Sequence, residues 1–231
     1  MLSYHFIHIQ INNKVLEGNW TGNYEGGEKP THWNGSDAIL ERYAETGKIV
    51  KFGQCWVFSA VTVTVCRALG IPCKSVTCIG SAHDTDDSTC IDEYYAENEE
   101  GDMEKSKYYT SDSIWNFHVW NEIFVKRSDL HDRTFDGWQV IDATPQEETS
   151  ENLFKGAYAC GPASVMAIKK GLCNRGFDAK FIFAEVNADV AKWKKKGWNW
   201  EIFGIDSKKQ VESNVFSSLT FYVFRNGSNR M

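Results

Sequence analysis

The sequence predicts an α+β fold. A single buried helical stretch is followed along the chain by several strands that can lie beside one another, which is typical of this class. Hydrophobic residues make up 42% of the 231 residues and charged residues 24%, as in ordinary globular proteins. No internal repeat or long low-complexity segment divides the chain, and its length fits one large domain or two small ones. Disordered, collagen-like and coiled-coil proteins are therefore excluded.

The first third of the chain contains the main helix. Residues 17–36 are rich in turn residues and aromatics and predict an ordered loop, after which Ser36 or Asp37 could cap a short helix through Tyr43. Residues 54–69 are ambiguous, because their Val-Thr alternation favours a strand. Their length, their alanines and the stop at Gly70-Ile71-Pro72 favour a buried helix, which we predict here, with a strand at 73–79.

The rest of the chain predicts strands around an acidic segment. Residues 83–104 contain ten acidic residues and no Lys or Arg, so we expect an acidic loop that ends near Asp112. Strands are expected at 116–126, 137–142 and 180–186, the second ending before Pro145, because proline cannot continue a strand ladder.

Charge, cysteines and the N-terminus limit the class of protein. The net charge of −6 argues against a general nucleic-acid binder, and the short basic run 192–196 is expected to be a solvated helix face. The chain has seven cysteines and no CxxC spacing, and we interpret them as mostly reduced thiols. The sequence shows no signal peptide and no run of 18 apolar residues, so we expect a cytoplasmic protein without a transmembrane segment. Release from the cell by a non-classical route is left open.

Three residues could form a nucleophilic site. Cys55 lies at the expected start of the helix, His118 lies within a strand among aromatics, and Asp142 ends the next strand. A helix N-terminus and a nearby histidine favour a reactive thiolate, and a third group should orient the base. A buried structural cysteine and a structural histidine are the alternative, and the residues alone leave both interpretations open.

Three segments resemble a known family. They are Gly-Gln-Cys-Trp-Val-Phe at 53–58, Trp-Asn-Phe-His-Val-Trp-Asn-Glu at 115–122 and Gly-Trp-Gln-Val-Ile-Asp-Ala-Thr-Pro-Gln-Glu at 137–147. They are similar to signature segments of the animal calcium-dependent transglutaminases, as are residues 81–84, 160–163 and 183–189. The resemblance runs in family order over residues 15–206, which would be the catalytic core, with divergent ends at 1–14 and 207–231.

The resemblance implies a papain-like core in which a nucleophile at a helix N-terminus packs on an antiparallel sheet. Cys55 would be the nucleophile, His118 the general base and acid, and Asp142 the orienting carboxylate. Trp20 would donate its indole N–H to the oxyanion, together with the backbone N–H of Cys55. Trp115 would line the tunnel that admits the amine.

The resemblance also implies Ca²⁺ as cofactor. The family calcium loop has the pattern Asp-x-Asp-x-Asn-x-Ser, which falls here on Asp84, Asp86, Ser88 and Cys90, with Asp112, six residues before His118, as a further member. Ser88 and Cys90 depart from that pattern, and Cys90 could contribute only its carbonyl. A second family site would include Asn187 and Asp189 but looks incomplete in this chain. Without the resemblance, the acidic run would be interpreted as a solvated face.

The implied function is calcium-dependent acyl transfer from protein glutamine side chains to lysine or small primary amines, through a cysteine thioester. The N-terminal β-sandwich and C-terminal β-barrels of the family do not fit in 231 residues, so we expect the core alone. Two alternatives remain: a cysteine hydrolase or deamidase that uses the same triad, and a truncated, inactive structural form. Neither nucleic acid nor a membrane is an expected partner.

Overall fold

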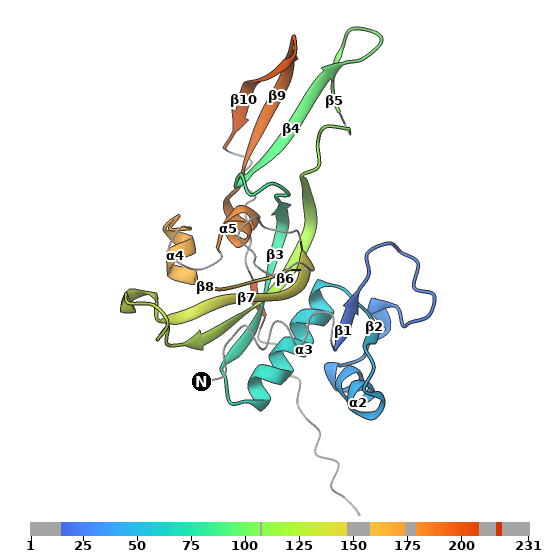
Figure 1. The fold of residues 1–231 in the computed structure, drawn as a ribbon, viewed down its shortest axis with the longest axis vertical. Coiled ribbons are helices and arrows are strands. Elements are labelled where there is room, and N and C mark those ends of the chain that lie inside the picture. Colours follow the sequence, from blue (N-terminus) through green and yellow to red (C-terminus); the bar gives the residue numbers. More distant parts are fainter. Residues whose placement is uncertain (1–14, 107, 147–157, 174–178, 208–215, 219–231) are drawn as a thin grey trace, which may run out of the picture.

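The computed structural model describes residues 15–106, 108–146, 158–173, 179–207 and 216–218 (Figure 1). Its helices are α2 (Ser36–Thr46), α3 (Cys55–Ala68), α4 (Val165–Lys169) and α5 (Lys180–Asn187), with 3-10 turns at Pro30–His32 and Arg133–Phe135. Its strands are β1 (Leu16–Gly18), β2 (Val50–Gly53), β3 (Cys73–His83), β4 (Cys90–Glu97), β5 (Met103–Lys105), β6 (Ser113–Val125), β7 (Gly137–Gln146), β8 (Tyr158–Ser164), β9 (Asp189–Lys196), β10 (Asn199–Asp206) and β11 (Phe216–Ser218).

The central sheet has the order β11-β3-β6-β7-β8, and all its neighbouring strands are antiparallel. Helix α3 packs on β3, β6 and β7. Phe58 and Val61 of the helix share a buried core with Ile123 and Ile141 of the sheet. The expected α+β class, with a helix on an antiparallel sheet, is confirmed.

A second sheet projects from the first (Figure 1). Its order is β10-β9-β4-β5, and β4 pairs with β9 in parallel, with Cys90 opposite Asp189. The segment between β3 and β4 is residues 84–89, which we call the acidic loop. This loop therefore lies where one sheet gives way to the other.

The ambiguous segment at 54–69 is helix α3, as predicted. The threonines that suggested a strand are accommodated by the helix, because Thr62 and Thr64 donate their hydroxyl hydrogens to carbonyls one turn earlier, at 2.8 and 3.1 Å. The helix stops before Gly70, whose φ of 75° lies in the left-handed region that glycine adopts without strain.

The strand expected at 180–186 is wrong, because these residues form α5. Phe181, Ile182, Ala184 and Glu185 are all buried, and the helix packs against β3. A short apolar run of this kind fits either a strand or a buried helix, so tertiary packing decides the outcome. The basic run at 192–196 is likewise not on a helix, because it lies in β9 and pairs with β10.

Five other elements differ from expectation at their boundaries. The N-cap of α2 is Gly35, and neither Ser36 nor Asp37 caps the helix, since the hydroxyl of Ser36 instead bonds to that of Thr64 at 2.6 Å. Strand β7 continues through Pro145, because its ladder with β8 is irregular between Asp142 and Gln146 and needs no donor there. Strand β3 extends beyond the expected 73–79, to His83. Strand β6 begins at Ser113, before the expected 116, and ends at Val125. The acidic segment is only partly a loop, because residues 90–97 pair with β9 and β5 as strand β4.

The loop expected at 17–36 is ordered, as predicted. Its backbone exchanges hydrogen bonds with β2, between Glu28 and both Lys51 and Phe52, and the indole of Trp33 donates to the carbonyl of Phe52 at 2.8 Å. No helix among the described residues is both long and apolar enough to cross a membrane.

Candidate active site

Cys55 is the first residue of α3, and the chain before it is held firmly. Gln54 has an extended backbone, and its side-chain amide donates to the carbonyl of Asn19 at 2.9 Å and to the hydroxyl of Tyr24 at 3.2 Å. Gly53 lies so close to Leu16 that a Cβ would come within 2.5 Å of it. These contacts fix the start of α3, so Cys55 lies at the end of the helix where backbone N–H groups point outward.

His118 lies in β6 and is 1% exposed. Its Nε2 atom is 2.6 Å from Oδ2 of Asp142 in the adjacent strand β7, and the Cys55 thiol is near enough to the ring to raise the pKa of the imidazole. The other oxygen of Asp142 accepts the backbone N–H of Thr144 at 2.9 Å. The structure therefore brings the three predicted triad residues together from α3, β6 and β7.

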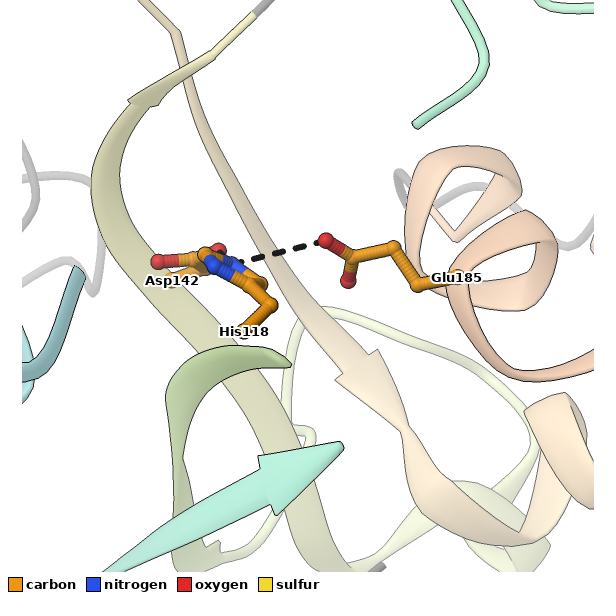
Figure 2. A group of neighbouring side chains, drawn as sticks. All are labelled: His118, Asp142 and Glu185. Atoms are coloured by element: carbon orange, nitrogen blue, oxygen red, sulfur yellow. Dashed lines mark hydrogen bonds and ion pairs between the residues drawn. The ribbon is translucent and has the colours of Figure 1, made fainter. Parts of the chain in front are cut away.

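Glu185 is a fourth buried member of this site that the sequence analysis missed. It extends from α5 towards His118 and Asp142, and its Oε1 atom lies 3.4 Å from Nε2 of the imidazole (Figure 2). Glu185 is 2% exposed. An acidic residue within the apolar run 181–186 was the available signal, because Glu is almost never fully buried without a partner.

The two carboxylates determine the charge of His118. Burial by itself lowers the pKa of the imidazole, but the charges of Glu185 and Asp142, the hydrogen bond with Asp142 and the bond with Cys55 outweigh it. The net result is a pKa of His118 well above the ordinary value of 6.5. A histidine in this setting carries a proton at neutral pH and can give it to a leaving group.

The same three side chains are also spaced closely enough to be considered as metal ligands. One ligand atom from each of His118, Asp142 and Glu185 lies within 4.8 Å of the others. Nε2 of His118 faces both carboxylates and is already engaged in the short hydrogen bond with Asp142. A proton shared between this nitrogen and the carboxylate oxygen therefore accounts for the close spacing of the three side chains without a metal ion. We therefore interpret it as a proton-transfer site.

Trp20 lies in the loop that is bound to the residues before Cys55. The backbone N–H of Asn19 donates to the carbonyl of Gly53 at 3.1 Å, and the ring of Trp20 lies over Gly18 and is 41% exposed. This places an indole near the start of α3. Among the described residues, the indole N–H of Trp20 makes no hydrogen bond with the Cys55 thiol.

Trp115 lies on β6 beside the triad. Its ring is stacked on His83 with centroids 4.6 Å apart and meets the ring of His118 edge-on at 5.9 Å. The ring of Phe181, from α5, packs edge-on against the ring of His83, with centroids 5.3 Å apart. The aromatic residues thus form a continuous wall next to the imidazole.

Three predicted metal ligands meet at the acidic loop, two from the loop itself and Asp112 from just before β6. Carboxylate oxygens of Asp84, Asp86 and Asp112 lie within 4.8 Å of one another, and Asp84 and Asp112 are buried. Burial raises the pKa of the Asp84 carboxyl and the nearby Asp86 charge adds to this, although backbone N–H donors oppose both. Three carboxylates this close fit a hard divalent cation, because it offsets their mutual repulsion and prefers oxygen ligands.

The other predicted ligands lie less favourably. The hydroxyl of Ser88 bonds to the backbone of Cys90 at 3.2 Å, although both residues remain next to the acidic loop. Asn187 ends α5, and Asp189 begins β9 opposite Cys90. Among the described residues, neither cluster of three acidic, histidine or cysteine ligands includes Asp189, and the second predicted site stays a prediction.

Comparison with known proteins assigns the chain to a family. The family model of the Transglutaminase-like superfamily matches residues 11–143. The chain is 46% identical over 217 residues to protein-glutamine gamma-glutamyltransferase K of Rattus norvegicus. The aligned region covers 90% of this chain and 25% of that protein. It is 53% identical over 182 residues to the hemocyte protein-glutamine gamma-glutamyltransferase of Tachypleus tridentatus, covering 78% of this chain and 22% of that protein.

A solved structure agrees with these sequence matches. The crystal structure of red sea bream transglutaminase superposes with a TM-score of 0.74 at 40% identity, over 92% of this chain and 31% of that one. The chain therefore spans about a quarter of the length of the curated relatives it matches.

Proposed function

The chain belongs to the transglutaminase-like superfamily, and from this premise we propose that it is the catalytic core of a protein-glutamine γ-glutamyltransferase. One observation carries the proposal. A buried imidazole, 2.6 Å from the carboxylate of Asp142, lies near enough to the Cys55 thiol at a helix N-terminus for the thiol to raise its pKa. Nucleophilic catalysis by cysteine requires this arrangement of nucleophile, base and orienting group.

The first half of the reaction acylates Cys55. The proton of the Cys55 thiol is held by His118, and the sulfur, as thiolate, attacks the side-chain carboxamide carbon of a protein glutamine. The oxyanion that forms is stabilised by the backbone N–H of Cys55 and the indole N–H of Trp20. His118 then protonates the departing nitrogen, ammonia leaves, and a thioester remains.

The second half transfers the acyl group to an amine. A lysine ε-amine attacks the thioester, His118 accepts the proton that the amine loses, and the Cys55 sulfur leaves. The products are an isopeptide bond and the free enzyme, with one ammonia released per cross-link. The aromatic wall around Trp115 excludes water, which would otherwise hydrolyse the thioester.

We propose that Asp84, Asp86 and Asp112 hold a calcium ion, with oxygens of Ser88 and Cys90 as further ligands. Calcium takes about six to eight hard oxygen ligands, and water can supply the remainder. When bound, the ion supplies positive charge that stabilises the loop beside β6, the strand that carries His118.

An assay with a labelled primary amine, a glutamine-bearing protein and calcium tests this function. We expect the wild-type chain to incorporate amine and Cys55→Ala to abolish incorporation. Cys66→Ala, in the last turn of the same helix, and Cys173→Ala, outside it, are the controls and should retain activity.

The same assay distinguishes the alternatives. Ammonia release without incorporation would identify a hydrolase or deamidase, and neither product would identify an inactive form. Equal loss of activity in all three cysteine variants would contradict Cys55 as the nucleophile.

A further inference from the structure

Helix α5 contacts both the candidate active site and the acidic loop. At one position, Glu185 reaches His118 at 3.4 Å (Figure 2). At its N-terminus, the ammonium of Lys180 lies 2.9 Å from Oδ2 of Asp87 in the loop. Both members of this ion pair are partly buried, with side chains 30% and 19% exposed. A single helix thus links the loop to the imidazole.

Packing along the helix makes this link stiff. Ala184 and Ala188 share a buried cluster with Ala82 and Ile91, which lie on either side of the acidic loop in the sequence. Close-packed interiors transmit displacement, because few voids are available to absorb it. A shift of the ends of the loop must therefore move α5 as well.

The conformation of the loop connects the ion pair to the carboxylate cluster. The carboxylate of Asp84 accepts the backbone N–H groups of Asp86, Asp87 and Thr89 at 2.7 to 3.0 Å. Asp87 and Thr89 have φ angles of 67° and 64°, in the left-handed region that residues other than glycine seldom adopt. The backbone arrangement that turns Asp87 towards Lys180 is therefore the one organised by Asp84, a member of the cluster.

We propose that the Asp87–Lys180 ion pair is a positioning contact that couples cation binding at the acidic loop, through α5 and Glu185, to the placement of His118. A cation and the ion pair favour the same loop conformation, so each strengthens the other, and this coupling is reciprocal. The inference rests on the proposed calcium-dependent acyl transfer. Neither Asp87 nor Lys180 contacts the reacting atoms.

The experiment uses the full 231-residue chain with labelled histidine side chains. His118 is one of six histidines, and its NMR signal is assigned by its loss in His118→Gln. Calcium is titrated while two quantities are measured: the dissociation constant, by calorimetry, and the ring chemical shift of His118. Amine incorporation is assayed separately.

In the wild type we expect the His118 signal to move as calcium saturates the loop. Lys180→Met and Asp87→Asn should still bind calcium, about two- to fivefold more weakly, as expected for a partly exposed ion pair. Both variants should lose a large part of the His118 response at saturation. Asn is used at position 87 because it also adopts the left-handed region.

Two comparisons separate this coupling from general damage. The double variant should be no worse than either single variant, because both substitutions remove the same contact, and Lys180→Arg should restore the response. Lys196→Met is the matched control, since it breaks a 3.0 Å ion pair with Glu201 in the β9–β10 hairpin.

A wild-type His118 signal that ignores saturating calcium would overturn the inference. So would a normal response in Lys180→Met, or single-variant effects that add up in the double variant. If the wild type incorporates amine but the variants respond normally, the inference fails and the proposed function stands. If calcium does not bind the wild type at all, both the calcium part of the proposed function and the inference fail.

Discussion

His118 is a buried imidazole faced by groups from four elements of the structure. Asp142 and Glu185 are its charged neighbours on β7 and α5, and Cys55 and Cys78 face it from α3 and β3. The pKa of the Cys78 thiol is raised to about 11, chiefly by burial, so that residue is neutral at physiological pH. The two carboxylates are therefore the counter-charges that keep the imidazole protonated.

We predict that Glu185→Gln lowers the pKa of His118. The substitution keeps the shape of the side chain but removes one negative charge 3.4 Å from the imidazole. A pH titration of the His118 ring signal by NMR measures the effect. Glu185→Asp keeps the charge and should retain most of the elevation, and an unchanged titration in the Gln variant would show that Asp142 alone sets it.

The same substitution should change how stability depends on pH. A histidine whose pKa is raised on folding contributes stability that is fully present below its unfolded pKa, near 6.5. This contribution is lost as the pH rises through the raised folded value. Thermal melts over that interval should therefore show a smaller loss of stability with pH in Glu185→Gln than in the wild type.

Asp142 and His118 can be separated by their variants. Asp142→Asn keeps the base but removes the charge that orients it, whereas His118→Gln removes the base. We expect at most trace amine incorporation from Asp142→Asn, about a hundredfold or more below wild type, and no more from His118→Gln. Rates near the wild-type rate in either variant, with the thermal melt unchanged, would contradict the triad.

At the residue scale, the sequence was sufficient to identify Cys55, His118 and Asp142 as a candidate triad. It was not sufficient for Glu185, because its contact depends on where α5 packs. A buried acid in an apolar segment indicates a partner, but the partner lies 67 positions earlier, at residue 118, and only the tertiary structure shows it.

Among the elements, the loop before α3 controls where Trp20 lies. A Cβ on Gly18 would lie 2.5 Å from the ring of Trp20 and 3.3 Å from Pro145, so Gly18→Ala must displace the ring. Because the ring is 41% exposed, it can move without unfolding the loop. We expect the rate of amine incorporation to fall by about ten- to a hundredfold, as for loss of an oxyanion donor, with a nearly unchanged melting temperature.

Gly204→Ala provides the matched control for this prediction. Gly204 lies in β10, and a Cβ there would meet nothing closer than the side chain of Lys192 at 3.8 Å. Its activity and stability should match the wild type. If Gly18→Ala also keeps the wild-type rate, the indole of Trp20 does not stabilise the oxyanion.

The elements that were predicted wrongly are those whose partners are distant in sequence. Helix α3 has its own stop signal and enough length to identify it, whereas 180–186 is a short apolar run that only its packing on β3 makes a helix. Strand β4 is acidic and is stabilised by pairing with β9, about a hundred residues later. Local composition cannot report either contact.

For the whole molecule, the acidic loop lies at the junction of two sheets. Strand β3 enters it from the central sheet, and β4 leaves it into the projecting sheet (Figure 1). Asp112 joins the loop from just before β6, and its carboxylate accepts the backbone N–H groups of Thr85 and Asp92 at 3.0 and 2.8 Å. Stabilising this loop therefore stabilises the connection between the sheets.

Calcium should consequently raise the melting temperature of the whole chain. A cation that binds only the folded loop stabilises by mass action, so the shift should grow with the logarithm of calcium concentration above the dissociation constant. Asp86→Ala removes a ligand from the cluster and should abolish most of the shift at about micromolar to millimolar calcium. Calorimetric melts over a calcium series measure it.

Asp102→Ala is the control, because it removes an acidic residue that is exposed between β4 and β5 and belongs to no ligand cluster among the described residues. Loss of a general acidic attraction for cations would lower the shift equally in both variants, whereas loss of a specific site lowers it only in Asp86→Ala. Magnesium also distinguishes a specific site from general attraction. It demands tighter octahedral geometry and gives up water reluctantly, so at a specific calcium site it should raise the melting temperature less than calcium does. A melting temperature indifferent to calcium would mean that the cluster holds no cation, and that the backbone N–H groups bonded to Asp84 and Asp112 are what stabilise these buried carboxylates.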